Sequence, residues 1–537
     1  MTEERPEGAE RPEDAAERSN TPTGIPRPAA SEAIKWKPLL DDLDARREAA
    51  RAMGGSERLA RQRAGGRLDA RARIDELLDR GTFVELGTLV GSVHRGATPP
   101  APADGLVAGH GLLEGRPVIV AAEDFTVMGG SIGIGTTAKR RRLVDLAEQE
   151  RVPLVMLLEG AGERTQNAFE RRGRSPNDLQ ALARLSGTVP SVCVVMGPSA
   201  GHGALTAPLM DFVVMVEGAA LFSAGPPLVK ASMGEDVTKD ELGGAAVHTV
   251  TSGVAHNAAT DDKAALALVR RYLSYFPSNA WEHPPPARDH AATGPRRLDE
   301  LIDLVPADPR RGYDVRRVIE IVFDEASVLE VAPAHARAVV TTLARLGGEV
   351  VAVVANQPAT KAGSIDSAAA DKAAHFLGIA DAFHLPVVFM ADNPGVLAGS
   401  AAERSGILRH AARMFAAQAR VRSPKLHVTL RKAYGFGSSL MAMNPFDGQS
   451  VTLALPGARL GAMPAEGGGQ AARLEADAQA LLEHAELGGA YSSADTMGYD
   501  EVIAPAELRN ALLDALRLTA VRRRQPVEPA RHRGILP

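Results

Sequence analysis

The sequence predicts an α/β protein made of two similar domains. From Val107 onward, short apolar segments rich in β-branched residues alternate with Gly-rich turns and Ala-rich helical stretches, which is the alternation expected of βαβ units. The composition agrees, because 45% of the residues are apolar, 24% are charged and only 4% are aromatic. At 537 residues the chain is too long for one ordinary hydrophobic core, so we expect at least two domains.

Three sequence blocks recur in the same order in the two halves of the chain. Each block is predicted to be a buried strand that leads into a Gly-rich turn. The matched blocks are 117–121 with 350–354, 153–157 with 386–390, and 190–195 with 424–429, at offsets of 350 − 117 = 233, 386 − 153 = 233 and 424 − 190 = 234. A nearly constant offset indicates that the chain contains two copies of one α/β domain.

The sequence before and between the two copies divides the chain. The N-terminal residues are rich in Glu, Arg and Pro and lack the apolar segment of a secretory signal, so they are predicted to be disordered. Two polar helical segments are expected next, at 39–51 and around 67–78, and the Pro-rich stretch 282–295 is typical of a linker. The expected parts are a disordered tail at 1–31, a first domain at 32–285 and a second domain at 296–537.

Charge and cysteine content narrow the classes of function. With 61 basic and 66 acidic residues the net charge is −5, which provides no basic field for nucleic acid or an anionic membrane. No apolar run approaches the roughly 18 residues needed to cross a bilayer. The single cysteine, Cys193, excludes a disulfide scaffold and a multi-cysteine zinc site, and it fits a reducing compartment. We expect a cytoplasmic protein that binds no metal, no nucleic acid and no membrane.

Each copy has a Gly-rich corner after its third strand block. The corners are Gly201-His202-Gly203 and Gly435-Phe436-Gly437. A strand that runs through G-x-G into a helix exposes backbone N–H groups, and such groups bind anionic oxygen. Two corners would therefore stabilise charge on two carbonyl oxygens. The alternative is that the glycines serve only for positive φ or close packing, and the pattern alone leaves both open.

A serine hydrolase is a competing hypothesis. The segment 197–201 fits the G-x-S-x-G elbow, in which Ser199 would be the nucleophile. The repeat places Ala433 at the equivalent position, and no HGGG-type oxyanion motif is present, so this hypothesis is disfavoured.

Two further motifs each have both a structural and a functional interpretation. His248 and His256 have no carboxylate at metal-ligand spacing, and we expect them to form hydrogen bonds within a loop. The basic run 139–142 is typical of a solvated helix face, and attraction of a phosphate-bearing ligand is the alternative.

The most specific stretch of the sequence is 235–244, which has the sequence E-D-V-T-K-D-E-L-G-G. Other distinctive stretches are 54–79, 124–131, 197–201, 248–256, 356–358, 393–395, 406–410 and 431–435. Together they resemble the carboxyltransferase (β) subunits of biotin-dependent acyl-CoA carboxylases, such as the propionyl-CoA and methylcrotonyl-CoA enzymes. The resemblance covers most of the chain.

The resemblance implies a fold, an assembly and a reaction. Each half is expected to have a crotonase-like fold, and subunits are expected to form a ring-like hexamer whose active sites lie between the first half of one subunit and the second half of another. The carboxyl group would pass from carboxybiotin to the α-carbon, or a vinylogous carbon, of an acyl-CoA, with negative charge on the ureido and thioester oxygens. The implied acyl-CoA residues are Gly129, Gly130, Ala200 and Gly201, the implied biotin residues are Gly435, Phe436, Gly437 and Ser439, and the implied catalytic residues are Gly201, His202, Gly203, Phe436 and Gly437.

Several positions depart from the family pattern. His202 stands in the first corner and Phe436 in the second, where the family has glycine. Ser439 replaces an aspartate associated with acyl-chain selection, and the segment 159–162, E-G-A-G, replaces D-S-G-G. Backbone donors survive side-chain changes, so these changes do not exclude activity, and the acyl group is left open.

The sequence also implies partners. It has no M-K-M biotinylation segment and no ATP-binding Gly-rich signature, so we expect a biotin carboxylase and biotin carboxyl carrier partner that holds the biotin. Two related hypotheses stay open: decarboxylation of a carboxyacyl-CoA with transfer to biotin, and a non-catalytic structural subunit of a mixed carboxylase complex, which Phe436 and Ser439 motivate. Homo- and hetero-oligomers are equally compatible with the sequence.

Overall fold

The structure, a computed structural model, describes residues 30–93, 99–167, 177–287, 294–530 and 534–535. The predicted tail at 1–31 lies outside the described residues except for its last two. The chain divides into two compact units, 1–48 and 49–537. The first unit contains most of helix α1 (Ala30–Arg51), which includes the predicted polar helix and carries exposed ion pairs one turn apart, such as Lys37 with Asp41 at 3.0 Å.

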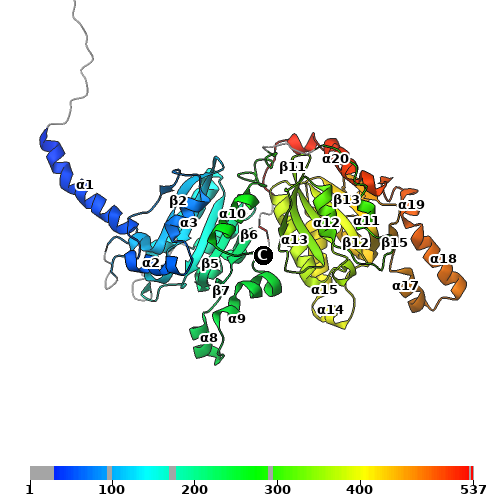
Figure 1. Ribbon diagram of the computed structural model, residues 1–537, viewed down its shortest axis with the longest axis horizontal. Coiled ribbons are helices and arrows are strands. Elements are labelled where there is room, and N and C mark those ends of the chain that lie inside the picture. Colours follow the sequence, from blue (N-terminus) through cyan, green and yellow to red (C-terminus); the bar gives the residue numbers. More distant parts are fainter. Residues whose placement is uncertain (1–29, 94–98, 168–176, 288–293, 531–533, 536–537) are drawn as a thin grey trace, which may run out of the picture. The chain divides into compact units, whose positions relative to one another are not determined.

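Within the described residues, the second unit holds two eight-stranded sheets of the same design (Figure 1). The strand order is β1-β2-β3-β4-β5-β6-β8 in the first sheet, with β7 beside β5, and β9-β10-β11-β12-β13-β14-β16 in the second, with β15 beside β13. In each sheet the first three strands pair antiparallel and the others pair parallel. The bounds are β1 (Val84–Glu85), β2 (Leu106–Leu113), β3 (Arg116–Glu123), β4 (Leu154–Gly160), β5 (Ser191–Ala200), β6 (Phe212–Val216), β7 (Ala220–Phe222), β8 (Asn257–Ala259), β9 (Leu329–Val331), β10 (Val339–Leu346), β11 (Glu349–Asn356), β12 (Val387–Asn393), β13 (Lys425–Tyr434), β14 (Val451–Ala454), β15 (Arg459–Gly461) and β16 (Glu501–Val502).

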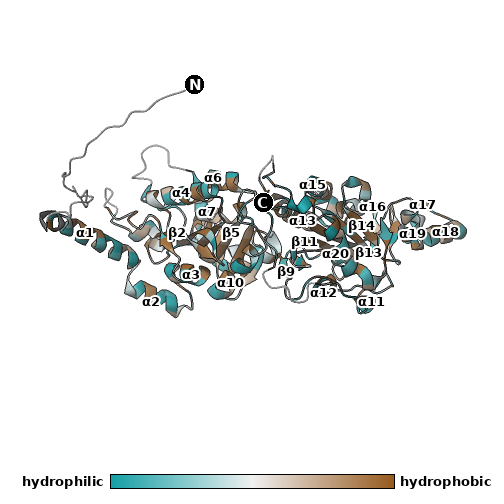
Figure 2. Ribbon diagram, turned by 90° about the horizontal axis from the view of Figure 1, so that it is seen from above, coloured by the Kyte–Doolittle hydropathy of each residue, from teal (hydrophilic) through white to brown (hydrophobic). Residues whose placement is uncertain are grey.

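Helices cover both faces of each sheet (Figure 2). On the first sheet, α4 (Ile134–Glu150) packs with α6 (Asp178–Leu185) on one face, and α3 (Ala70–Leu77) packs with α10 (Asp262–Leu273) on the other. On the second sheet, α13 (Ser367–Ala382) and α15 (Ile407–Arg420) cover one face, and α12 (Val315–Val322) and α20 (Leu508–Leu518) cover the other. The predicted helix around 67–78 corresponds to α3.

The remaining short elements lie mostly at strand ends. They are α2 (Ser56–Ala64), η1 (Pro102–Gly105), η2 (Met128–Gly130), α7 (Gly201–Ala204), η3 (Ala207–Leu209), α8 (Pro226–Met233), α9 (Lys239–Gly243), the π-helical turn η4 (Val247–Ser252), α11 (Leu301–Leu304), η5 (Lys361–Gly363), α14 (Ser400–Arg404), α16 (Gly435–Leu440), η6 (Pro445–Asp447), α17 (Ala465–Ala472), α18 (Ala476–Leu487), α19 (Gly489–Ala494), η7 (Pro505–Glu507) and η8 (Arg522–Arg524).

Local chemistry explains where the main elements begin. The parallel strands next to the corners are buried on both faces, as their continuous apolar sequences require. Short polar side chains cap the helices that follow: Asn177 Oδ1 accepts from Gln180 N at the start of α6, and Asp366 Oδ1 accepts from Ala369 N at the start of α13.

The predicted duplication is confirmed down to a local irregularity. The matched sequence blocks correspond to β3 and β11, β4 and β12, and β5 and β13. The pairing of β4 with β5 shifts register between Leu158 and Gly160, and the pairing of β12 with β13 shifts between Ala391 and Asn393. Both shifts come just before the Gly-rich corners. The predicted domain boundaries at 285 and 296 stay a prediction.

One hydrophobic cluster spans the two halves, and a second one lies within the second half. A single cluster of buried residues contains side chains of both sheets, including Phe276 and Phe383, whose rings meet edge to face at 5.5 Å. Asn257 at the start of β8 donates to Glu330 O and accepts from Ala332 N, which ties the first sheet to β9. Across the described parts of the chain, no helix has both the length and the apolar character to cross a membrane.

Candidate active site

The first corner lies where β5 ends and α7 begins. Ala200 is the residue before the helix, Gly201 takes a positive φ of 57°, and His202 and Gly203 complete the first turn. The first turn of a helix directs backbone N–H groups outward without intrahelical partners. A Cβ on Gly203 would meet its nearest neighbours, Glu123 Oε1 and Ser199 Oγ, at 3.6 Å, so the turn is not tightly packed from below.

A second Gly-rich turn lies beside this corner. Gly129 and Gly130 both take positive φ in η2, and Gly129 O accepts from Ala161 N at 2.9 Å. A Cβ on Gly162 would meet Ala200 O at 3.0 Å. The segment after β4 therefore lies between the η2 turn and the first corner, so the structure brings the four predicted acyl-CoA residues into one region.

His202 is held by a buried carboxylate. Its Nε2 lies 2.6 Å from Oδ1 of Asp178, the first residue of α6, and the imidazole is 29% exposed. Burial alone would raise the pKa of Asp178, but the hydrogen bonds and charges of His202 and Arg140 outweigh burial and hold the pKa far below its usual range. An ionised carboxylate only accepts hydrogen bonds, so His202 donates from Nε2 and a neutral ring has its lone pair on Nδ1.

Buried charges continue below the first corner. Arg140, on α4, donates from Nε to Asp178 at 2.6 Å and from Nη1 to Glu123 at 3.0 Å, and all three side chains are buried. Burial raises the pKa of Glu123, and the charge of Arg140 opposes that shift. Glu123 also accepts from the backbone N–H of Glu159 at 2.9 Å. The corner therefore rests on a layer of paired charges.

The layer extends through Glu159, the first residue of the E-G-A-G segment. Glu159 is fully buried and accepts from Arg73 Nη1 at 2.6 Å, and Arg67 also contacts it. Arg73 in turn donates from Nε to Asp262 at 2.9 Å. Sequence reasoning singled out the segments that contain Glu159, Arg67 and Arg73 but missed these contacts, because the partners are far apart in the chain and form no spacing pattern.

The expectation of a solvated basic helix face at 139–142 is wrong for its first two residues. Lys139 is 6% exposed and donates to Leu106 O, and Arg140 is 1% exposed. Arg141 and Arg142 do lie at the surface or partly so. Successive helix residues point about 100° apart, so four consecutive basic side chains cannot all lie on one face.

The second corner repeats the backbone of the first. β13 ends at Tyr434, and Gly435 takes a positive φ of 54° at the start of α16. A Cβ on Gly435 would lie 2.9 Å from Ala462 O, and a Cβ on Gly437 would lie 2.5 Å from Asn393 Oδ1. Phe436 is 53% exposed, and Ser439 is partly buried on the next turn. The predicted biotin residues therefore lie together.

Amides lie below the second corner. Asn393 Nδ2 donates to Asn356 Oδ1 at 3.0 Å, and Asn393 Oδ1 accepts from Gly395 N at 3.0 Å. Two ion pairs with Asp392 are nearby: Arg431 Nε donates to Asp392 at 2.7 Å, and Lys432 Nζ lies 3.5 Å from it. No hydrogen bond among the described residues joins the two corners of one chain.

A cavity of about 450 Å³ opens beside the η2 turn. Its residues include three arginines, Arg58, Arg61 and Arg67, together with Phe125 and Gly129. Arg58 Nη1 donates to Thr126 O at 3.0 Å, which fixes the position of that guanidinium. A basic cavity with an aromatic wall next to a glycine turn suits a ligand that carries phosphate groups.

The structure disfavours the hydrolase hypothesis, and it corrects the expectation that two histidines bond within a loop, because His248 also bonds to β7 and His256 bonds to β6. Ser199 is fully buried within β5, and its Oγ has no hydrogen-bond partner among the described residues, so no base activates it. His248 bonds to Ser252 Oγ at 2.9 Å and to Leu221 O at 2.6 Å, and His256 Nδ1 accepts from Val213 N at 2.9 Å. Among the described residues, no cluster of three His, Cys, Asp or Glu side chains is suited to a metal.

Comparisons with known proteins place the chain in a family. Residues 61–535 match the carboxyl transferase domain. The chain is 37% identical over 516 residues to the propionyl-CoA carboxylase carboxyltransferase subunit of Haloferax mediterranei, covering 93% of this chain and 99% of that protein. It is 35% identical over 498 residues to the methylmalonyl-CoA decarboxylase subunit alpha of Veillonella parvula, covering 90% and 96%. A solved structure of transcarboxylase 12S, whose description gives hexamer assembly and bound methylmalonyl-coenzyme A and methylmalonic acid, has a TM-score of 0.85 at 35% identity and covers 93% of this chain and 99% of that one.

Duplicated sheets with matching glycine corners define an enzyme with two tandem crotonase-like domains. The chain belongs to the carboxyl transferase domain family, as a carboxyltransferase subunit of acyl-CoA carboxylases. The predicted fold class, family and enzyme class are confirmed.

Proposed function

We propose that the chain transfers a carboxyl group from biotin, carried on a partner protein, to an acyl-CoA bound at the first corner. The observation that carries the proposal is the repeated glycine corner, together with the arginine-lined cavity beside the first corner. Both relatives named above act on CoA esters, and both align with nearly the whole chain.

The first half suits an acyl-CoA. Arg58 and Arg61 offer charge and donors to the CoA phosphates, whereas Arg67 is paired with Glu159. The thioester would then extend past Gly129 and Gly130 toward Ala200 and Gly201, with its oxygen at the N–H groups of the first corner. Loss of the α-proton places negative charge on this oxygen, and each backbone donor there is worth about 3 to 4 kcal/mol of transition-state stabilisation.

His202 supports the first corner in this proposal. Its bond to Asp178 ties α7 to α6, and Asp178 is itself fixed by Arg140. Gly201 and Gly203 contribute only their backbone.

In this proposal the second half binds biotin. A Cβ on Gly435 or Gly437 would collide with neighbouring oxygens, so close packing requires glycine at both positions. The ring of Phe436 is exposed. When bound, biotin supplies the carboxyl group and a ureido oxygen that becomes negatively charged. Gly435, Phe436 and Gly437 would offer backbone donors to that oxygen. Ser439 would lie next to the acyl chain or the biotin ring and contribute to substrate selection.

The proposal includes an assembly. The description of the transcarboxylase 12S structure gives a hexamer in a multienzyme core. We infer a hexamer here too, with each active site built from the first corner of one subunit and the second corner of another, and with a biotin carboxylase and carrier partner in the cytoplasm. The absence of any hydrogen bond between the two corners of one chain, among the described residues, agrees with sites formed between subunits.

The test is carboxylation by the purified chain with a biotin carboxylase and carrier partner, ATP and bicarbonate, across a panel of acyl-CoAs. Turnover of one or more acyl-CoAs is expected. Changing Arg58 and Arg61 together to Ala should raise KM for the acyl-CoA about tenfold and leave kcat nearly unchanged, because uniform binding is lost. The exposed Arg517→Ala variant is the matched control. No turnover with a partner that supports a related subunit would contradict the proposal.

Decarboxylation is the second candidate, and the Veillonella parvula relative favours it. The same purified chain, given a carboxyacyl-CoA and unloaded carrier, would then carboxylate the carrier without ATP. Mixing the chain with an active homologue tests the structural-subunit hypothesis, which predicts activity only in the mixture.

A further inference from the structure

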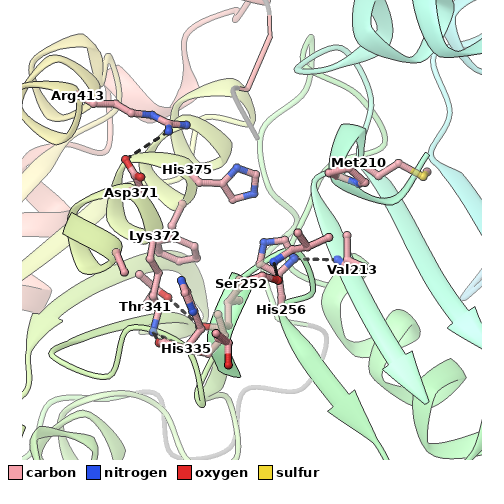
Figure 3. A pocket seen from close by; sticks show the side chains of 18 residues that line it. Met210, Val213, Ser252, His256, His335, Thr341, Asp371, Lys372, His375 and Arg413 are labelled. Atoms are coloured by element: carbon pink, nitrogen blue, oxygen red, sulfur yellow. Dashed lines mark hydrogen bonds and ion pairs between the residues drawn. The ribbon is translucent and has the colours of Figure 1, made fainter. Parts of the chain in front are cut away.

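A second cavity lies between the two halves of the chain, away from both corners. Its volume is about 320 Å³, at the lower end of the range for small-molecule sites. The first half contributes residues from η3, the start of β6 and the segment after η4, and the second half contributes β9, the loop that follows it, α13 and α15 (Figure 3). His335 of that loop donates from Nδ1 to Val250 O of η4 at 3.1 Å, which closes one side of the cavity.

One polar group of this cavity lacks a partner. His256 is 9% exposed, and its Nδ1 accepts from Val213 N. Burial, followed by the charges of His375, His335 and Lys372, lowers the pKa of His256 well below its usual value, so the ring is neutral. A neutral ring that accepts at Nδ1 carries its proton on Nε2, and this N–H has no hydrogen-bond acceptor among the described residues. This N–H is open to an acceptor bound in the cavity, which His256 lines.

Lys372 forms no ion pair among the described residues, and the charge of Glu330 acts on it only beyond contact distance. Lys372 is 9% exposed and donates to three carbonyl oxygens, those of Ala332 at 2.8 Å, His335 at 3.0 Å and Val339 at 2.9 Å. These oxygens satisfy the three N–H bonds but carry no full negative charge. The two carboxylates of this region are engaged elsewhere: Asp371 with His410 and Arg413, and Glu330 with Arg316.

Part of the lining is apolar. Met210, Val213, Val331 and Phe376 line the cavity together with polar residues such as Ser252 and Thr341, and the imidazoles of His256 and His375 stack at 5.1 Å. Figure 3 shows α13, with Lys372 and His375, facing the end of the first sheet that carries Met210 and His256. The cavity thus offers a hydrogen-bond donor from His256, a positive charge on Lys372 and apolar side chains such as Met210 and Phe376.

We propose that this cavity binds a small organic carboxylate, with its carboxylate group at His256 and Lys372 and its short apolar chain against Met210, Val331 and Phe376. The cavity is too small to enclose a CoA ester, so the ligand is a free acid. Because the ligand would contact both halves of one chain, it would stabilise their packing. This proposal does not depend on the proposed function.

The affinity should depend on pH. Burial lowers the pKa of Lys372 to about 7, with Glu330 raising it and Arg316 lowering it. The other groups that face the site are His256, His335 and His375, with Asp371 and Arg413 as a pair and His410 beside them. The ammonium charge is present below pH 7 and lost above it, so carboxylate affinity should fall about tenfold between pH 6 and pH 8.

The test is isothermal titration of the intact chain with hexanoate, hexan-1-ol and inorganic phosphate. Hexanoate should bind at millimolar concentration or below, and the alcohol and phosphate should bind at least about tenfold more weakly. Equal binding of hexan-1-ol would overturn the role of charge, and equal binding of phosphate would overturn the role of the apolar wall. The absence of any heat or thermal shift with 10 mM hexanoate would overturn the site itself.

Two variants locate the site. His256→Asn keeps an acceptor for Val213 N and removes the Nε2 donor, and it should weaken hexanoate binding about tenfold. His384→Asn is the matched control, because His384 is a buried histidine that bonds to Ala280 O between the halves but does not line the cavity. Ala368→Leu fills the cavity without removing a side-chain hydrogen bond and should abolish binding, so the test survives if His256→Asn does not fold. Unchanged binding in Ala368→Leu would contradict the proposal.

Discussion

The two corners have the same backbone but rest on different chemistry. Glu123 ends β3 and Asn356 ends β11, at equivalent positions of the two copies. Below the first corner Glu123 joins Arg140 and Asp178 in a buried layer of charges, whereas below the second corner Asn356 joins Asn393 in a pair of amides. The duplication has therefore kept the main-chain geometry and let the buried side chains diverge. The first corner depends on balanced charge, and the second depends on close packing.

The largest expected effect comes from unbalancing the charges. Arg140→Met would leave Asp178 and Glu123 buried without their cation, which should lower the free energy of unfolding by about 3 to 5 kcal/mol. Arg141→Met is the matched control on the same helix, since Arg141 forms only a partly exposed pair with Asp145 and should cost less than about 1 kcal/mol. Denaturant unfolding measures both variants, and similar losses in the two would contradict the charge-layer interpretation.

Because the two corners differ in packing, an added methyl group should lower kcat/KM more at the second corner than at the first. Gly437→Ala would push against Asn393 and the backbone of Gly395, displacing the second corner and lowering kcat/KM by about 100-fold. Gly203→Ala has ordinary contacts at 3.6 Å and should lower kcat/KM less than tenfold. Steady-state kinetics of the two variants makes the comparison. A larger loss of kcat/KM in Gly203→Ala than in Gly437→Ala would contradict the conclusion that the second corner is the more tightly packed one.

The start of β6 adds a pH effect to the first half. Asp211 is buried and accepts from Ser191 N and Oγ at 2.8 Å, and burial raises its pKa to about 7 despite these bonds. Between about pH 4 and pH 7 the folded chain holds a proton on Asp211 that the unfolded chain releases. The free energy of unfolding that this proton contributes is complete below pH 4 and is lost as the pH rises to about 7. Between pH 5 and pH 6.5 the wild type should lose about 2 kcal/mol relative to Asp211→Asn. The measurement is the free energy of unfolding of both proteins in urea at each pH. The same change with pH in the two proteins would contradict the prediction.

The smallest effect concerns the side chains at the tips of the corners. His202→Ala removes a charge-assisted bond to Asp178 and should lower the free energy of unfolding by about 1.5 kcal/mol at pH 7. Phe436→Ala, at the equivalent position, removes an exposed ring and should cost about 0.5 kcal/mol or less. Equal losses would show that His202 is no better anchored than Phe436.

The repeated framework was predictable because it depends on local patterns. Apolar runs bounded by glycines located β3, β4 and β5 and their copies, and G-x-G located both corners. The charge layer was not predictable in this way. Arg140 meets Asp178 and Glu123 only after two helices and a strand have packed, and its neighbours in the sequence suggested a solvated face. The partners of His202 were hidden for the same reason.

The common core of the two halves has a consequence for synthesis on the ribosome. Phe276 packs against Phe383, which is translated 383 − 276 = 107 residues later. The first half therefore leaves the exit tunnel with part of its apolar surface uncovered, and it stays so until the helix that carries the partner ring has been made. Exposed apolar surface in a nascent chain invites chaperones and aggregation. Slowing translation between these two positions would prolong that exposure.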